Sequence, residues 1–304
     1  MRLAFLADIH GNLPALEAVL IDLQQQRPDA VYLVGDQVNR CPWNTEVMTI
    51  VTELGWPAIA GNHDLIVGAI NTPQNRPPFT NPIRFPTLWW TQAQLTEDHL
   101  CTIRQWPAEL QIQWAGLPEI RLIHGIPGNA FVGILPDEDE QKVRQVLAPV
   151  AETVVVCGHI HRPLARQVDR WRIFNGGSVG IPYNGDQRAQ YLLLDGVQGQ
   201  WQPTFRRVDY DHSPIPAAFH ASGLQAAVGP IAELHLRTVM SGEPWTSDFG
   251  YWLRYQTPEL NNDMPKAVQL YLQQHGPGRW AFDLHRNGVP SGEVFVLGVQ
   301  AEGL

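Results

Sequence analysis

Residues 3–12 read Leu-Ala-Phe-Leu-Ala-Asp-Ile-His-Gly-Asn, an apolar run that ends abruptly in polar side chains. Five apolar residues in a row fit a buried strand, and Asp8 and His10 follow it directly. A helix is predicted next, because leucines recur at steps of three and four residues over 13–23, behind the capping residue Asn12. The opening therefore predicts a strand, a polar loop and a helix.

The same order of apolar strand, polar cluster and helix recurs along the chain. Further strands are predicted at 30–34, 57–60, 120–123, 153–157, 171–174, 191–195 and 204–208, and further helices at 45–54, 87–95 and 141–147. Alternating strands and helices indicate an α/β domain. Since side chains at the carboxyl ends of strands gather at one edge in such folds, the polar clusters are expected to form one site.

Two later stretches have a different composition. Five prolines interrupt residues 71–86, which predicts a long surface loop that borders the site. After about His212 the sequence becomes rich in Ala and Pro, with helices predicted at 231–240 and 265–274. We therefore expect one domain over 1–212 and a helix-rich C-terminal extension over 213–304, whose role the sequence leaves open.

Composition and charge restrict the class of partner. The chain has 304 residues, of which 44% are hydrophobic, so it can bury a sizeable core. Its formal net charge is -9 and it contains no run of Lys or Arg, so the electrostatic footprint of a nucleic-acid-binding protein is missing. An anionic substrate would have to be attracted locally, and bound divalent cations would do this within an acidic protein.

Cysteine usage and the N-terminal segment indicate the compartment. Cys41, Cys101 and Cys157 are far apart and odd in number, which argues against a disulfide framework or a zinc knuckle and favours a reducing environment. The apolar residues 1–7 are too few for a signal peptide or a membrane span. A cytoplasmic protein without membrane attachment is expected.

The polar clusters offer a mixed set of carboxylate, carboxamide and imidazole groups. These are Asp8, His10, Asp36, Asn62, His124, His159 and His161. Imidazole favours Zn, Fe, Ni or Mn over Mg or Ca, and a carboxylate is able to bridge two ions. Two ions about 3.5 to 4 Å apart would hold a hydroxide between them and neutralise charge on a phosphoryl oxygen. Taken singly, each group is more often a cap or a satisfied core residue, but seven together favour a metal site.

The ordered series of these clusters resembles the signature of the calcineurin-like metallophosphoesterases. Its five blocks are Asp8-x-His10, Gly35-Asp36, Gly61-Asn62-His63-Asp64, His124-Gly125 and Gly158-His159-x-His161. The resemblance spans about residues 1 to 210. Residues 175–188 resemble the closing segment of the predicted phosphodiesterase branch, which includes small bacterial enzymes and diadenosine-tetraphosphate hydrolase-like members. The resemblance implies a four-layer αββα sandwich with its metal site at strand ends.

The resemblance also implies how the ligands divide between two divalent metal ions. Asp36 would bridge the ions, one held by Asp8, His10 and His161, the other by Asn62, His124 and His159. Mn²⁺ is the first expectation, with Fe, Zn, Ni or Co as alternatives. The implied reaction is hydrolysis of a phosphodiester, phosphomonoester or nucleotide anhydride by a hydroxide that bridges the two metals.

The catalytic roles that the resemblance implies fall on two adjacent residues. His63 would lie outside both metal shells, facing the scissile bond, where it protonates the leaving oxygen or stabilises charge there. Asp64 would orient the imidazole of His63. The alternative reading of Asp64 is a residue that only caps the helix that follows.

Two residues are candidates for substrate contact. Arg40 occupies the place of a phosphate-contacting arginine in phosphatase-like members, and a guanidinium is able to grip two phosphate oxygens. Asn39 and Cys41 stand where that pattern has Asp and Gly, so Arg40 is equally readable as a surface ion-pair partner. Asn12 is expected to touch a metal-bound water or the substrate.

Other aromatic and histidine residues are predicted to have structural or incidental roles. Trp89, Trp90 and Trp106 are expected to pack in the core or in a dimer contact, which leaves a homo-oligomer open. Six further histidines lack a partner at metal spacing and are predicted to be incidental: His99, His212, His220, His235, His275 and His285.

Three functions compete on this evidence. The leading hypothesis is a metal-dependent hydrolase of a small phosphorylated substrate, nucleotides included. The second is a non-catalytic scaffold of the same fold that binds a protein partner, which would be marked by lost ligands or a lost His63, and neither loss is seen. The third is a nuclease, against which the acidic charge counts.

Overall fold

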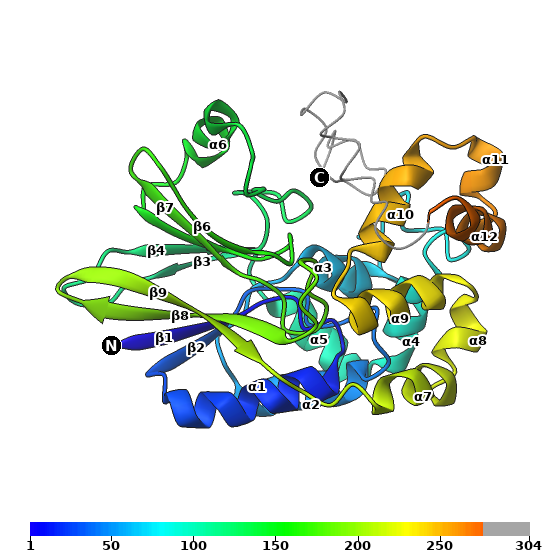
Figure 1. Ribbon diagram of the computed structural model, residues 1–304, viewed down its shortest axis with the longest axis horizontal. Helices are drawn as coiled ribbons and strands as arrows, with labels where there is room; N and C mark the ends of the chain where they lie inside the picture. The colour runs from blue at the N-terminus through cyan, green and yellow to red at the C-terminus, as the bar shows by residue number, and fades with distance from the viewer. Residues whose placement is uncertain (276–304) are drawn as a thin grey trace.

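The computed structural model describes residues 1–275. Residues 276–304 of the predicted extension, with His285 among them, lie outside the described residues. Within the described range, two β-sheets pack against each other and helices flank them (Figure 1). The predicted strands and helices between residues 3 and 208 are confirmed except for strand 57–60. The four-layer α/β architecture expected from the sequence is confirmed as well.

The first sheet has the order β2-β1-β8-β9 and carries the N-terminal strand in its interior. Its strands are β2 Ala30–Leu33, β1 Arg2–Leu6, β8 Ala189–Val197 and β9 Gln200–Val208. Strands β1 and β2 are parallel, and β8 is antiparallel to β1 with Ala4 opposite Leu193. Both faces of β1 are buried, which explains its continuous apolar sequence.

The second sheet has the order β3-β4-β5-β7-β6. Its strands are β3 Glu109–Ile112, β4 Ile120–Ile123, β5 Val154–Cys157, β7 Trp171–Gly176 and β6 Pro163–Val168. The central three strands are parallel, so their carboxyl ends lie at one edge. Only the two edge strands, β3 and β6, are antiparallel to their neighbours.

Alternating side chains of β1 divide between the two inner layers of the core. Leu3 and Phe5 pack between the sheets against residues such as Leu122. Ala4 and Leu6 face the opposite side, where helices α1 Leu13–Gln26 and α2 Asn44–Leu54 cover the first sheet. Helix α6 Glu140–Leu147 covers the outer face of the second sheet in the same way. These four layers bring the carboxyl ends of β1, β2, β4 and β5 together.

Three further helices follow α2 along the chain. They are α3 Asn62–Ala69, α4 Pro86–Gln94 and α5 Glu97–Gln105. Residues 71–85 between α3 and α4 contain no helix or strand, as their prolines predict. The predicted strand at 57–60 contributes only one bridge, Leu33 to Ala58, because Pro57 has no N–H to donate and the chain turns into α3 at Gly61.

Between β9 and residue 275 the chain forms six helices, which lie at one end of the molecule and run from yellow-green to dark orange in Figure 1. They are α7 Pro214–Ala221, α8 Leu224–Val228, α9 Ile231–Ser241, α10 Trp245–Arg254, α11 Pro258–Asn261 and α12 Met264–Gln274. The helices predicted at 231–240 and 265–274 are confirmed. These helices share an apolar core that also takes in Cys41 and Ile181. Among the described residues, no helix combines the length and the apolar character that a bilayer crossing requires.

Candidate metal centre

The carboxyl ends of the strands bring all seven predicted ligands to one place. Asp8 and His10 follow β1, Asp36 follows β2, Asn62 begins α3, His124 follows β4, and His159 and His161 follow β5. All are buried except His159, which is partly exposed. A buried cluster of two carboxylates and four imidazoles requires compensation, because unpaired charge is costly inside a protein.

The backbone at these positions is held in a conformation that side chains other than glycine rarely adopt. Positive φ angles between 51° and 70° occur at Asp8, His10, Asp36, His159 and His161. Each such residue costs on the order of 1 kcal/mol or more, so the surroundings must fix it. Backbone hydrogen bonds do so: the N–H of His10 donates to the carbonyl of Asp36 at 3.0 Å, and that of Gly180 to the carbonyl of Asp8 at 3.0 Å.

A first group consists of Asp8, His10, Asp36 and His161, whose ligand atoms all lie within 4.8 Å of one another. The Nε2 atoms of His10 and His161 are 3.3 Å apart, and Nε2 of His161 is 3.3 Å from Oδ1 of Asp8. Two imidazole lone pairs that face each other repel unless a proton or a cation lies between them. This donor set therefore fits a divalent transition-metal ion.

A second group consists of Asp36, His124 and His159, again within 4.8 Å. Oδ1 of Asn62 joins it, 3.2 Å from Nε2 of His124 and 3.0 Å from Nδ1 of His159. Asp36 belongs to both groups, since its Oδ2 is 3.6 Å from Nε2 of His10 and 3.3 Å from Nε2 of His124. One carboxylate thus stands between two sets of ligand atoms.

Backbone carbonyls outside the cluster fix the orientation of three imidazoles. The Nδ1 atoms lie within hydrogen-bond distance of a carbonyl oxygen: His10 of Val38 at 3.2 Å, His124 of Val34 at 2.7 Å and His161 of Ile181 at 2.7 Å. An Nδ1–H that donates to a carbonyl leaves the Nε2 lone pair free to face the cluster. This is the arrangement in which metal-binding histidines are held.

The pKa values of His124 and Asp36 indicate which proton a bound cation would replace. Burial alone would lower the pKa of His124, but the facing carboxylates of Asp36 and Asp8 raise it to about 10. Burial raises the pKa of Asp36, yet the neighbouring imidazoles of His124 and His63 hold it well below its usual range. A proton on His124 therefore compensates Asp36 in the absence of metal, and metal binding would release it.

His63 lies beside the first group without belonging to it. Its ring is edge-on to that of His10, with centroids 4.9 Å apart. Its Nδ1 is 2.6 Å from the side-chain amide of Asn39, and its Nε2 is 3.4 Å from Nη2 of Arg40. Burial lowers the pKa of His63 to about 3, with Arg40 and His161 acting in the same direction and Asp36 against it.

Asp64 occupies a different position from the one expected of an orienting partner. Its Oδ2 accepts the backbone N–H groups of Asp36 at 2.7 Å and Gly61 at 3.0 Å, and its Oδ1 accepts that of Gln37 at 3.0 Å. Within the described residues, no hydrogen bond joins Asp64 to the ring of His63. The alternative reading, a helix cap, matches this geometry, and the cap also fastens the loop that carries Asp36.

Arg40 and Asn12, the two predicted substrate-binding residues, differ in the hydrogen bonds that their side chains already make within the protein. Arg40 is half-buried, has a φ of 77° and reaches His63 at the rim of the cluster. The amide of Asn12 is committed to the protein: Nδ2 donates to the carbonyl of Gly180 at 2.7 Å and to the hydroxyl of Tyr210 at 3.1 Å, and Oδ1 caps α1. The side chain of Asn12 thus ties two loops together, and its contact with substrate stays a prediction.

Comparison with known proteins identifies the family. The profile of the calcineurin-like phosphoesterase superfamily domain matches residues 1–199. The chain belongs to this family. Phosphoesterases of this family are metal-dependent hydrolases, and the His and Asp groups described above are suited to hold divalent ions.

Curated relatives and solved structures agree with that assignment. Phosphodiesterase YfcE of Escherichia coli strain K12 is 29% identical over 207 residues, which cover 64% of this chain and 88% of that protein. A metallophosphoesterase from Sphaerobacter thermophilus has a TM-score of 0.65 and 26% identity, covering 80% of this chain and 100% of that one. A hypothetical protein from Pyrococcus horikoshii OT3 shares the fold, with a TM-score of 0.67, 24% identity and coverage of 79% and 98%.

Several contacts around the candidate metal centre were not predicted from the sequence. The hydroxyl of Ser178 donates to the carbonyl of Asp8 at 2.7 Å, and the ring of Tyr183 stacks on that of His161 with centroids 4.1 Å apart. Thr91 donates to Oδ1 of Asn39 at 3.2 Å. The only signal for Ser178 and Tyr183 was their place in the turn-rich segment 175–188.

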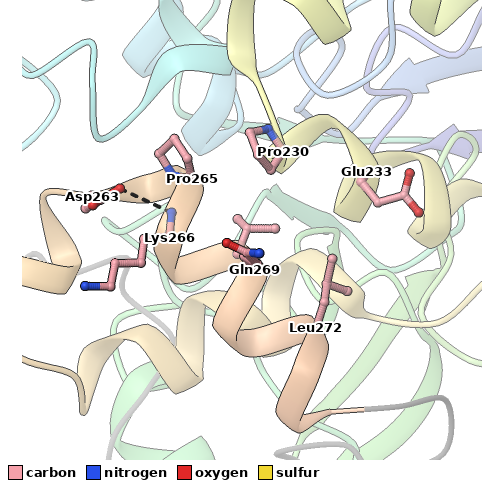
Figure 2. A pocket seen from close by; sticks show the side chains of 8 residues that line it. Pro230, Glu233, Asp263, Pro265, Lys266, Gln269 and Leu272 are labelled. Atoms are coloured by element: carbon pink, nitrogen blue, oxygen red, sulfur yellow. Dashed lines mark hydrogen bonds between the residues drawn. The ribbon is translucent and has the colours of Figure 1, made fainter.

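A groove of about 530 Å³ lies apart from these residues, between α9 and α12 (Figure 2). Its lining is Pro230, Glu233, Asp263, Pro265, Lys266, Val268, Gln269 and Leu272. It contains no histidine and only scattered charges. Of the histidines predicted to be incidental, His235 is buried and bonded to the hydroxyl of Thr87 at 3.0 Å, which is a structural role.

Proposed function

We propose that the two groups of ligand atoms are two metal sites of a phosphoesterase. The sites would be held by Asp8, His10 and His161 on one side and by Asn62, His124 and His159 on the other, with Asp36 shared. The observation that carries this proposal is the position of the Asp36 carboxylate, 3.6 Å from Nε2 of His10 and 3.3 Å from Nε2 of His124. When bound, two divalent ions would supply an activated water and neutralise charge on a phosphoryl oxygen.

The groups at the rim would handle the substrate. Arg40 has a fixed positive charge and is suited to bind oxygens of the phosphoryl group. His63, in contact with Arg40, would stabilise charge on the leaving oxygen through a hydrogen bond. Asp64 would act only through the backbone, by holding the Asp36 loop and the start of α3.

The chemistry of the ligands restricts the choice of metal ion, and the E. coli relative restricts the class of substrate. Four imidazoles suit Fe, Zn, Ni or Co better than Mg²⁺ or Ca²⁺, and the two carboxylates beside them also suit Mn²⁺, which is our first choice. The name of the E. coli relative favours a phosphodiester among small phosphorylated substrates, with nucleotides included.

Hydrolysis by chelator-stripped protein tests this function. Bis-p-nitrophenyl phosphate, p-nitrophenyl phosphate and a dinucleoside tetraphosphate would be offered with and without added Mn²⁺. We expect Mn²⁺ to restore turnover of at least one substrate, the diester first. If protein that holds two metals per chain hydrolysed none of the three substrates, this result would contradict the proposal.

We further propose that the chain consists of a phosphoesterase domain over 1–212 and an extension over 213–304 that supports the site loops. Cys41, next to Arg40, and Ile181, whose carbonyl accepts from His161, both lie in the apolar core of helices α7 to α12. The N–H of Gly185 donates to the carbonyl of Gly242 at 2.9 Å. The likeness to the Sphaerobacter structure also covers more of the chain than residues 1–212 contain.

A further inference from the structure

Tyr183 has a buried hydroxyl that is not hydrogen-bonded to any part of the chain that the structure describes. Its side chain is 6% exposed, and its hydroxyl has no hydrogen-bond partner within the described residues. The backbone is firmly held, because its N–H donates to the carbonyl of His161 at 3.0 Å and its carbonyl accepts from Nε of Arg162 at 2.9 Å. A buried hydroxyl without a partner is uncommon and calls for an explanation.

The position of the ring places this hydroxyl beside the candidate metal centre. The ring of Tyr183 lies parallel to the imidazole of His161, with centroids 4.1 Å apart and an interplanar angle of 15°. Burial raises the pKa of Tyr183, Arg40 opposes that change, and Asp8 adds to it. The ring of Tyr183 is connected to Arg40 by a series of contacts, in which His161, His10 and His63 follow one another.

The guanidinium of Arg40 also has N–H groups without an acceptor among the described residues. Its Nη2 contacts His63, but its Nε and Nη1 are buried and have no hydrogen-bond partner within the described residues. Arg40 and Tyr183 are thus two donors at one side of the centre for which residues 1–275 supply no acceptor. An anion with several oxygens would satisfy both.

We infer that Tyr183 is a further substrate-binding residue, whose hydroxyl donates to a non-bridging oxygen of the phosphoryl group that Arg40 also binds. This inference rests on the proposed function and adds a second phosphate donor to it. Stacking on His161 would fix the direction of the hydroxyl, so that little freedom is lost when the substrate binds.

The test uses Tyr183→Phe in the full chain, which keeps the stacked ring and removes only the hydroxyl. The matched control is Tyr271→Phe, because Tyr271 is also buried but donates to Asp248 at 2.7 Å within the C-terminal helices. Bound Mn²⁺, the thermal midpoint of the metal-free protein, calorimetric affinity for inorganic phosphate, and kcat and KM would be measured for each.

For Tyr183→Phe we expect unchanged Mn²⁺ content, a midpoint as high as that of the wild type or higher, and phosphate affinity reduced roughly tenfold or more. Tyr271→Phe should lower the midpoint by about 3 °C and leave phosphate affinity unchanged. The double variant of Tyr183→Phe with Arg40→Ala should lose less affinity than the two single losses combined, because both donors serve one anion.

Unchanged phosphate affinity and kinetics in Tyr183→Phe would overturn the inference, and so would loss of Mn²⁺, which would mean that the residue only supports His161. Phosphate binding is measured without turnover, so the two proposals are separable. Protein that binds phosphate through Tyr183 yet hydrolyses nothing would contradict the proposed function and support this inference.

Discussion

The loops around the candidate centre and the helices after residue 212 are built differently. Within residues 1–275, eleven non-glycine residues have a positive φ, and seven of them surround the centre: Asp8, His10, Asp36, Asn39, Arg40, His159 and His161. The described part of the C-terminal helices has no non-glycine residue of this kind, and its core is apolar. Backbone strain and the cluster of buried charges lie in the loops, whereas the helices supply mainly apolar packing around the buried carboxylate of Asp248, which accepts from Tyr271.

This difference predicts two separable kinds of damage. Substitutions in the loops should remove metal binding or turnover without unfolding the chain, since strained and charged sites are not optimised for stability. Substitutions in the helical core should lower stability first.

The largest effect is expected from Asp36→Asn. The carboxamide keeps the shape of the side chain but removes the charge that both groups of ligand atoms share. Turnover should fall to background and Mn²⁺ content, measured by elemental analysis after dialysis, should fall at both sites. Asp98→Asn, on the exposed surface of α5, is the matched control. An Asp36→Asn protein that keeps two metals would break the comparison.

His63→Ala should reduce kcat by roughly a hundredfold or more and leave the metal content intact. The imidazole lies beside the first group, edge-on to His10, and is not among its ligand atoms. Kinetics and elemental analysis on one preparation check both parts. Loss of a metal would contradict the division between ligands and substrate-facing residues.

Leu234→Ala in α9 should lower the free energy of unfolding by about 2 to 5 kcal/mol, because the side chain is fully buried in the apolar helical core. The control Leu54→Ala changes a leucine that is 37% exposed and should cost less than about 1 kcal/mol. Denaturant unfolding gives both values. Equal losses would show that the helices do not contribute the packing assigned to them.

A smaller effect is expected from pH. The raised pKa of His124, about 10, means that metal-free protein holds a proton there at neutral pH. Binding of Mn²⁺ must release it, so affinity should rise about tenfold for each pH unit between 6.5 and 8.5. Isothermal titration in two buffers of different ionisation enthalpy would detect the released proton. Affinity that does not depend on pH would contradict this picture of the cluster.

The sequence predicted best what depends on local order. Six of the seven ligands come directly after apolar strands, so Asp8 and His124 could be placed at strand carboxyl ends without coordinates, although their strands lie in different sheets. Partners distant in sequence could not be read from a pattern. Asp64 accepts N–H groups from 27 and 28 residues away, and Asn12 donates to the carbonyl of Gly180 and the hydroxyl of Tyr210. These hydrogen bonds therefore emerged only from the folded arrangement.

The same limit explains the elements that the sequence did not predict, which in the described residues are β3, β6, α3, α5, α7, α8, α10 and α11. Strand β6 is an edge strand with a weak apolar pattern, and helix α5 has little apolar character beyond Leu100 and Ile103. Tertiary packing rather than local propensity decides such segments.

The most direct test of the shared position of Asp36 is a crystal structure of Mn²⁺-loaded protein, with anomalous scattering recorded at the manganese edge. We predict two peaks, about 3.5 to 4 Å apart, on either side of the Asp36 carboxylate. A single peak, or two peaks of which one lies away from Asp36, would contradict the account.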